Sequence, residues 1–292
     1  MATVFYDKAA VSVSLGGVGE TLLASDFSIN YSASAQPLYT IGRHGSLGQF
    51  PSSARAGDVS FNFITSITGN PNGFKGNFIN YLASGVKHSV GATASGVLIS
   101  GAGVKGIGFL SSYSLNVASN SVSTSSASFT FFGSGAQLPV SGRLADSTAT
   151  PEINAGKLAT GVAHGRYTAL TPFETSISDD GPTNTDVGNI FGADYSISFN
   201  HNPVYKVGQE FPVTSFYTTA QESVNVTEDV FNSGLAFDDT ATDKMIILKG
   251  LDADGEAQSM ELEMISGKQV STSMSAGLDD IVRSQKTLTA SY

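Results

Sequence analysis

The stretch Asp26-Phe27-Ser28-Ile29-Asn30-Tyr31, followed by Pro37-Leu38-Tyr39-Thr40-Ile41-Gly42, decides the fold expected for this chain. Apolar and small polar side chains alternate along its first part, which is the period of a β-strand with one buried face. The same order returns as Asp194-Tyr195-Ser196-Ile197-Ser198-Phe199 followed by Pro203-Val204-Tyr205-Lys206-Val207-Gly208. A strand pair that returns in the same order predicts an internal duplication.

Further strands are expected around this pair in each half, because alternating apolar and polar residues recur there. In the first half they cover Val11–Leu15, Val59–Phe63, Val97–Ile99, Tyr113–Val117 and Phe129–Phe131. Their counterparts in the second half are Ser223–Thr227, Lys244–Lys249, Val270–Met274 and Leu288–Tyr292. We therefore expect two β domains, residues 1–133 and 186–292, joined by a linker or insert at 134–185. Within that insert, Thr168–Phe173 favours a strand that packs on a domain or on a neighbour.

One short helix is expected in the first domain. Apolar residues fall at helical spacing in Pro71–Ser84, behind Asn70 as a cap and before Gly85 as a stop. The Gly/Ser/Ala-rich span Ser84–Gly108 then predicts a strand inside a long flexible arm or loop.

The composition argues against direct nucleic-acid binding. Charged residues make up 14% of the 292 residues, the formal net charge is −10, and Lys and Arg are not clustered. A surface of this kind suits a conduit through which DNA slides without sticking. The first residues do not resemble a signal peptide and no run of 18 apolar residues occurs, so we expect synthesis in a cytoplasm and no membrane partner.

Motifs for chemistry are weak, and we expect no catalytic, cofactor or metal site. The Gly101–Gly106 segment matches a dinucleotide-binding fingerprint, but strand periodicity follows it where a helix is required. An EF-hand-like set at Asp252, Asp254, Gly255 and Glu261 also fits a hairpin turn. The four histidines are far apart, and the chain has no Cys for a thiolate site.

The duplicated pattern resembles the tail tube proteins of long-tailed bacteriophages, here as two tandem domains. The resemblance covers about 11–133 and 186–292 and lies in the strand order: the alternating strand, the Pro-aromatic-Gly segment, a third strand, the short helix and arm, and two closing strands. It implies a mainly β protein of two tandem tube-like β-sandwich or barrel domains.

In that family, six such domains form a ring with a continuous inner β-barrel, and loops and arms stack the rings. The resemblance therefore implies a non-enzymatic virion tail protein, a homotrimer with pseudo-hexameric rings, through which DNA and the tape-measure protein pass.

Small polar side chains occupy one face of the expected strands, and the resemblance implies that this face lines the lumen. The positions are Ser28, Asn30, Ser60, Asn62, Ser114, Asn116, Ser196, Ser198, Asn225, Ser271 and Ser273.

Two other interpretations stay open. One is another virion structural protein, such as a tail hub, a terminator or a head decoration protein. The other is a non-viral carbohydrate-binding β-sandwich module, against which the absence of Trp counts. An enzyme ranks behind both, because no convergent set of catalytic residues occurs.

Overall fold

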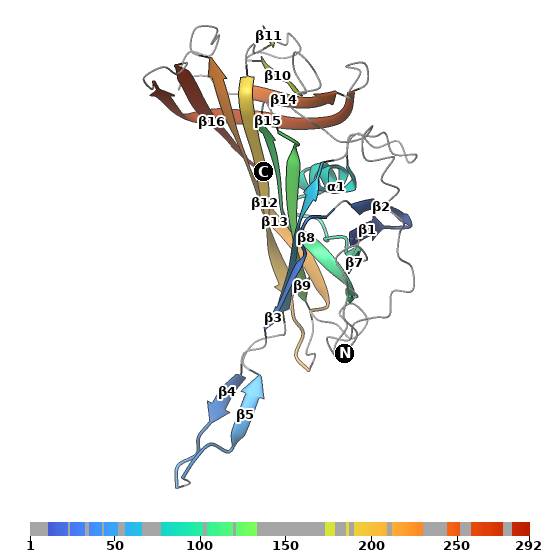
Figure 1. The fold of residues 1–292 in the computed structure, drawn as a ribbon. Helices are drawn as coiled ribbons and strands as arrows, with labels where there is room; N and C mark the ends of the chain where they lie inside the picture. The colour runs from blue at the N-terminus through green and yellow to red at the C-terminus, as the bar shows by residue number, and fades with distance from the viewer. Residues whose placement is uncertain are drawn as a thin grey trace.

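A computed structural model shows a mainly β protein with one helix in its described part (Figure 1), which confirms the expected fold class. It describes residues 11–22, 24–32, 35–42, 44–51, 56–65, 77–101, 104–118, 121–132, 173–178, 185–186, 190–208, 212–229, 244–251, 258–276 and 282–292. The Asp254–Gly255 turn and most of 134–185 lie outside these residues.

The elements of the first half are β1 (Val11–Leu15), β2 (Val18–Leu22), β3 (Ser28–Ser32), β4 (Ala35–Leu38), β5 (Gly48–Pro51), β6 (Ala56–Ile64), α1 (Phe78–Lys87), β7 (Val97–Gly101), β8 (Val104–Ala118) and β9 (Thr124–Phe132). Those that follow are β10 (Phe173–Ser178), β11 (Thr185–Asp186), β12 (Ile190–Val204), β13 (Thr214–Asp229), β14 (Lys244–Leu251), β15 (Gln258–Ser275) and β16 (Arg283–Ser291).

The two halves have the same topology. In the first, antiparallel pairing gives the orders β2-β1-β7-β8 and β3-β6-β9-β8. In the second, it gives β11-β10-β14-β15 and β12-β13-β16-β15. We call β1–β9 the first repeat and β10–β16 the second repeat. Residues 173–178, which fall in the predicted linker, and residues 185–186, at its boundary with the second predicted domain, thus contribute strands to the second repeat.

The strand registers define equivalent positions in the two repeats. Ser28 pairs with Ser60 and Ser60 with Ser128 in the first repeat, as Ser196 pairs with Ser223 and Ser223 with Thr289 in the second. On the third strand of each repeat, Ser114 pairs with Ser126 as Ser271 pairs with Thr287.

The repeats are joined into one sheet where β8 pairs with β12. In this register Ser114 lies opposite Ser196, and Asn116 lies opposite Asp194. We call this pairing the internal junction. The two repeats therefore share one sheet across it.

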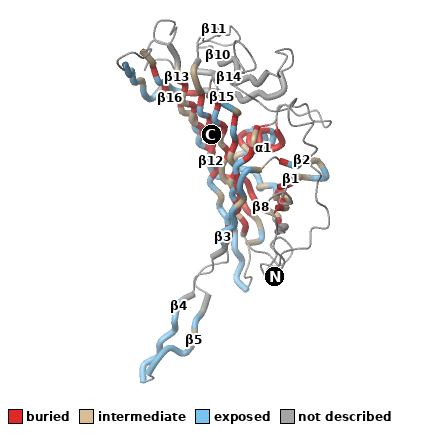
Figure 2. Tube along the Cα trace, in the orientation of Figure 1, coloured by how far each residue is buried: buried red, intermediate tan, exposed pale blue. Residues whose placement is uncertain are grey.

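The core lies on the apolar face of the shared sheet, where α1 packs (Figure 2). Every second residue is buried along β6 and along the 193–199 part of β12, as expected from the alternation in the sequence. The Phe61 ring stacks between Phe27 and Phe129, with centroid distances of 6.2 and 5.9 Å. Burial of apolar and aromatic side chains of this kind is the main favourable contribution to the free energy of folding.

The prediction for the helix is wrong in its bounds. α1 begins at Phe78, because the side chain of Asn77 accepts a hydrogen bond of 2.8 Å from the backbone N–H of Asn80. It does not stop at Gly85 but continues to Lys87. The arm predicted at Ser84–Gly108 consists of the end of this helix, turns and the β7–β8 hairpin. Because β8 begins at Val104, no helix follows the Gly101–Gly106 fingerprint.

Two hairpins lie at one end of the shared sheet, and one of them, β4–β5, is a separate two-stranded sheet. The β4–β5 hairpin projects away from the body, at the opposite end from β10 and β14 (Figure 1). In the second repeat, the same place in the order is taken by the continuation of β12 and β13. Gly42 and Gly208, which end the two Pro-aromatic-Gly segments, have φ of 88° and 84°, a backbone conformation that favours glycine.

Candidate functional site

The polar positions singled out in the sequence all lie on one face of the shared sheet. Along β12, Asp194, Ser196 and Ser198 are exposed, whereas Tyr195 and Ile197 between them are buried. Since side chains alternate across a strand, the strand registers carry this polar face across both repeats. The positions brought together are Ser28, Asn30, Ser60, Asn62, Ser114, Asn116, Ser196, Ser198, Asn225, Ser271 and Ser273.

These side chains form rows that cross the strands. One row joins Ser28, Ser60, Ser128, Ser112, Ser198, Gln221 and Ser291. The hydroxyl oxygens of Ser28 and Ser60 are 2.6 Å apart, and those of Ser114 and Ser126 are 2.8 Å apart. Hydroxyls that bond one another across strands cover this part of the face with small, uncharged groups.

The sheet is hollowed on this polar side. A groove of about 590 Å³ lies at the internal junction. Its lining includes Ser112, Ser114, Ser126, Ser196, Ser198, Gln221, Ser223, Thr289 and Ser291. A concave polar face has the curvature required of the inner wall of a barrel.

The carboxylates on this face are held by neighbouring donors. Asp26 accepts hydrogen bonds from the backbone and side-chain N–H groups of Asn62, and Asp194 accepts one from the side chain of Asn116. Asp26 and Asp194 are equivalent in the two repeats. Asp58 accepts a bond of 2.9 Å from the Thr130 hydroxyl.

The shared sheet ends at two edges that carry exposed apolar side chains. Within the described residues, β3 pairs only with β6, and the 268–275 part of β15 pairs only with β16. Ile29 on β3 is 44% exposed, whereas its equivalent Ile197, at the internal junction, is 1% exposed. Met274 on β15 is 68% exposed, whereas its equivalent Val117 is 6% exposed. The sequence predicts Ile29 on a buried face, and the single chain leaves it uncovered.

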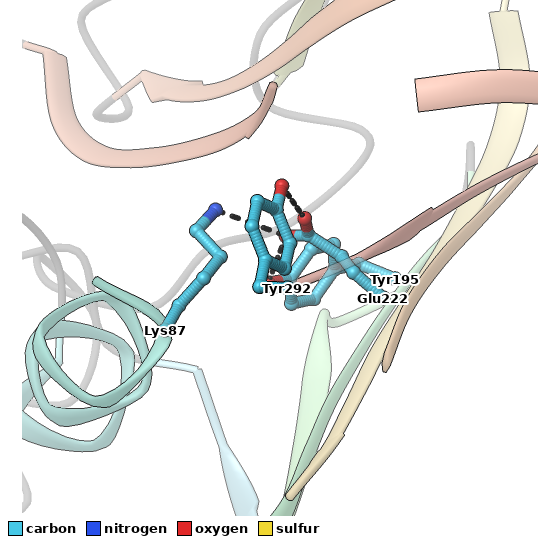
Figure 3. A network of polar contacts seen from close by, with 4 residues as sticks. All are labelled: Lys87, Tyr195, Glu222 and Tyr292. Atoms are coloured by element: carbon cyan, nitrogen blue, oxygen red, sulfur yellow. Dashed lines mark hydrogen bonds and ion pairs between the residues drawn. The ribbon is translucent and has the colours of Figure 1, made fainter. Parts of the chain in front are cut away.

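A buried polar network crosses the internal junction on the opposite face (Figure 3). The Lys87 ammonium at the end of α1 lies 3.2 Å from Oε1 of Glu222 on β13. The hydroxyls of Tyr195 and Tyr292 donate bonds of 2.5 and 2.7 Å to the two carboxylate oxygens of Glu222. The Lys87 ammonium also lies 5.3 Å from the centre of the Tyr292 ring. Burial, and next the Glu222 charge, raise the pKa of Tyr195 well above its ordinary value, so its hydroxyl stays a donor.

Other contacts strengthen the same junction. The His201 ring places Nε2 2.8 Å from the carbonyl oxygen of Leu110 on β8. Burial lowers the pKa of His201, so the neutral ring donates through Nε2–H. After α1, the backbone N–H groups of Gly91 and Ala94 donate to the carbonyls of Tyr217 and Ser215 on β13.

The sequence analysis missed this network, although one signal for it exists. Tyr195, Glu222 and Tyr292 are equivalent to Phe27, Val59 and Phe131 of the first repeat. Polar groups that replace apolar ones at three core positions of one repeat indicate a local polar partner.

No cluster suited to metal binding emerges among the residues described. No group of three or more His, Asp or Glu side chains is placed there to hold a metal ion. His44 lies in the loop between β4 and β5, His88 follows the end of α1 and His201 lies on β12, whereas His164 is outside the described ranges. Nor does this part of the chain contain a helix long and apolar enough to cross a membrane.

No known family model matches the chain, and no curated protein is significantly similar to it in sequence.

Proposed function

We propose that this chain is a structural subunit of a bacteriophage tail tube, in which three copies close a ring and the polar face lines a channel for DNA. The observation that carries the proposal is the pair of edges on β3 and β15. Their exposed Ile29 and Met274 are equivalent to Ile197 and Val117, which the internal junction buries. Pairing β15 of one chain with β3 of the next would therefore repeat the internal junction and bury both side chains.

The register also suits a closed barrel. The row that starts at Ser28 reaches β12 at Ser198, two residues beyond Ser196, the equivalent of Ser28. The first repeat thus shifts the register by two residues along the strand, and barrel closure requires a stagger of this kind. Repetition of one heterologous contact closes a ring when its rotation permits.

The dimensions fit duplex DNA. Each chain contributes eight strands to the wall, in the order β3-β6-β9-β8-β12-β13-β16-β15. Three chains would give 24 strands, and at about 4.8 Å per strand the wall would have a diameter of at least about 37 Å, because strand tilt widens a barrel beyond this value for untilted strands. The net charge of −10 and the small polar lining disfavour binding of the phosphate backbone.

The hairpins supply a way to stack rings. Leu38, Tyr39 and Ile41 are exposed at the tip of the β4–β5 hairpin, and Val204, Tyr205 and Val207 are exposed at the tip of the β12–β13 hairpin. Exposed apolar tips at the end of a projecting hairpin are typical of an interaction site. On this proposal, they contact the next ring.

A disulfide between chains tests ring closure. The chain has no Cys, so S28C/S271C introduces the only thiols. Ser28 and Ser271 are equivalent to Ser196 and Ser114, which lie opposite each other in the internal junction. Directly opposite residues are within disulfide reach. We expect oxidation of the assembled protein to yield covalently closed trimers, seen as one band on a non-reducing gel and as rings or tubes by electron microscopy.

The matched control is S60C/S271C. Ser60 lies one strand further from the edge, so its Cα would be about 9.6 Å from that of residue 271, beyond disulfide reach. A chain that carries S28C/S271C but stays monomeric on oxidation, at high concentration and with other tail proteins added, would contradict the proposal.

A further inference from the structure

The internal junction differs in chemistry from the ring-closing junction, although the strands of both are equivalent. At the internal junction, α1 of the first repeat places Lys87 against Glu222, Tyr195 and Tyr292 of the second repeat. At the equivalent positions, a first repeat offers Phe27, Val59 and Phe131, which have neither a carboxylate nor a hydroxyl.

We propose that the Lys87–Glu222 ion pair is the determinant by which a first repeat selects a second repeat as its neighbour. The inference rests on the proposed function, because a choice among repeats of several chains arises only in an assembly.

Burial gives this ion pair its discriminating power. The side chains of Lys87 and Glu222 are 4% and 0% exposed. A buried ion pair adds little net stability over an apolar pair, but removal of one partner is strongly destabilising, since the other charge is left buried and unpaired. The first repeat has Val at the position of Glu222, so α1 placed on that face would bury the Lys87 ammonium without the carboxylate of Glu222. Discrimination of this kind works by penalising the wrong partner.

The two tyrosines complete the acceptor. Tyr195 bonds the same carboxylate oxygen, Oε1, that contacts Lys87, and Tyr292 bonds the other. Tyr292 is fixed in turn by two backbone hydrogen bonds with Ala220. The carboxylate is thus held toward α1 before any first repeat docks, and its identity as an acceptor belongs to the second repeat alone.

The strand register at the internal junction allows repeat pairing to be measured with a disulfide. Ser114 of the first repeat lies opposite Ser196 of the second, so S114C/S196C forms a disulfide only when the two repeats pair. In the parent chain this disulfide is expected within one chain. K87E alone brings two carboxylates together, and E222K alone brings two ammonium groups together. We expect each variant to lower the yield of the intrachain disulfide by roughly tenfold or more.

Mixing the two variants tests selection separately from folding. When K87E and E222K chains that carry S114C/S196C are refolded together, every exchange between chains joins opposite charges. In one pairing the carboxylate introduced by K87E meets the ammonium introduced by E222K, and in the other the unchanged Lys87 meets the unchanged Glu222. We expect the 114–196 disulfide to return as a link between different chains, detected as a covalent heterodimer of two chains with different tags. Two differently tagged parent chains, refolded in the same way, give the background of exchange.

The neutral variant K87M/Y195F/E222V/Y292F keeps the test decisive if the charged variants fail to fold. It gives the second repeat the apolar residues of the first and leaves no hydroxyl there without its acceptor, and we expect it to recover the intrachain disulfide that K87M or E222V alone loses. Equal disulfide yields in K87M, E222V and the parent would overturn the inference. So would a mixture of K87E and E222K whose chains fold but form no heterodimer above background. The S28C/S271C disulfide measures ring closure separately. A failure of the proposed ring assembly can therefore be distinguished from a failure of repeat selection.

Discussion

The carboxylate of Glu20 on β2 accepts a hydrogen bond of 2.7 Å from the backbone N–H of Phe78, the first residue of α1. The free N–H groups at a helix start carry a partial positive charge, which a carboxylate satisfies. A residue 58 positions away in the chain thus completes the cap that Asn77 begins. The contact fixes the helix that carries Lys87 to the first repeat.

The free energy of unfolding is expected to depend on the titration of Glu20. Burial raises its pKa above 4.5, and the bond from Phe78 only partly opposes this. With a raised pKa the folded state binds more protons than the unfolded state, so stability falls as pH rises from about 4.5 through the raised value. E20Q, which keeps an acceptor oxygen, should remove this pH dependence and be at least as stable at neutral pH. Denaturant unfolding across this pH range measures both.

The control for this prediction is E20A, which removes the acceptor as well as the charge. It should be less stable than E20Q at every pH, because the N–H of Phe78 then loses its partner. An E20Q chain whose stability keeps the parent's slope through this window would show that another group titrates there.

The helix cap at Asn77 is expected to matter on its own. N77A removes the acceptor for the backbone N–H of Asn80 and should lower the free energy of unfolding by about 1 kcal/mol. N77S keeps a side-chain acceptor without adding a charge at this buried position and is the matched control. Denaturant unfolding of both variants at one pH measures the difference, and an N77A chain as stable as the parent would contradict the role assigned to this side chain.

Much of the fold follows from the sequence, because the repeated alternation specifies both strands and their faces. The pattern at Asp26–Tyr31 and Asp194–Phe199 is enough to identify equivalent strands and the polar face. Alternation does not tell which strand lies at an edge, and the exposure of Ile29 depends on that. The strand predicted at Thr168–Phe173 meets β10 only at Phe173, its residues 168–172 lying outside the described part. The sequence predicts no strand at β11, which is only two residues long.

The site is less predictable than the fold, because its polar network joins residues far apart in sequence. Lys87 and Glu222 are separated by 135 positions, and nothing local marks either as half of a pair. The start of α1 differs from the predicted start for a related reason. Both Asn70 and Asn77 satisfy the sequence rule for a cap, and only the packing of Phe78 and Ile79 into the core selects Asn77.

The hairpin tips are expected to control tube length without affecting the fold of the chain. Ile41 and Val207 are fully exposed, so I41D and V207D should leave the free energy of unfolding within about 0.5 kcal/mol of the parent. A charge buried between rings is costly, so each variant should shorten the tubes, and the double variant should stop at single rings. Electron microscopy measures tube length.

The matched control is Y81D, which places the same charge on the exposed side of α1, away from the hairpins. It should form tubes of normal length. If I41D/V207D assembles tubes as long as those of the parent, the tips do not stack rings.

The polar face should be reached only through the channel once tubes form. Ser198 is exposed on the concave side in the single chain, so a bulky maleimide reagent should label S198C at the rate of a free surface thiol. In tubes its labelling should fall by at least tenfold, because the reagent must diffuse along the lumen, whereas Y81C on α1 should label equally well in both states. A small maleimide that fits the lumen should label S198C in tubes and so show that the thiol is intact. Equal labelling of S198C by the bulky reagent in single chains and in tubes would place this face outside the channel.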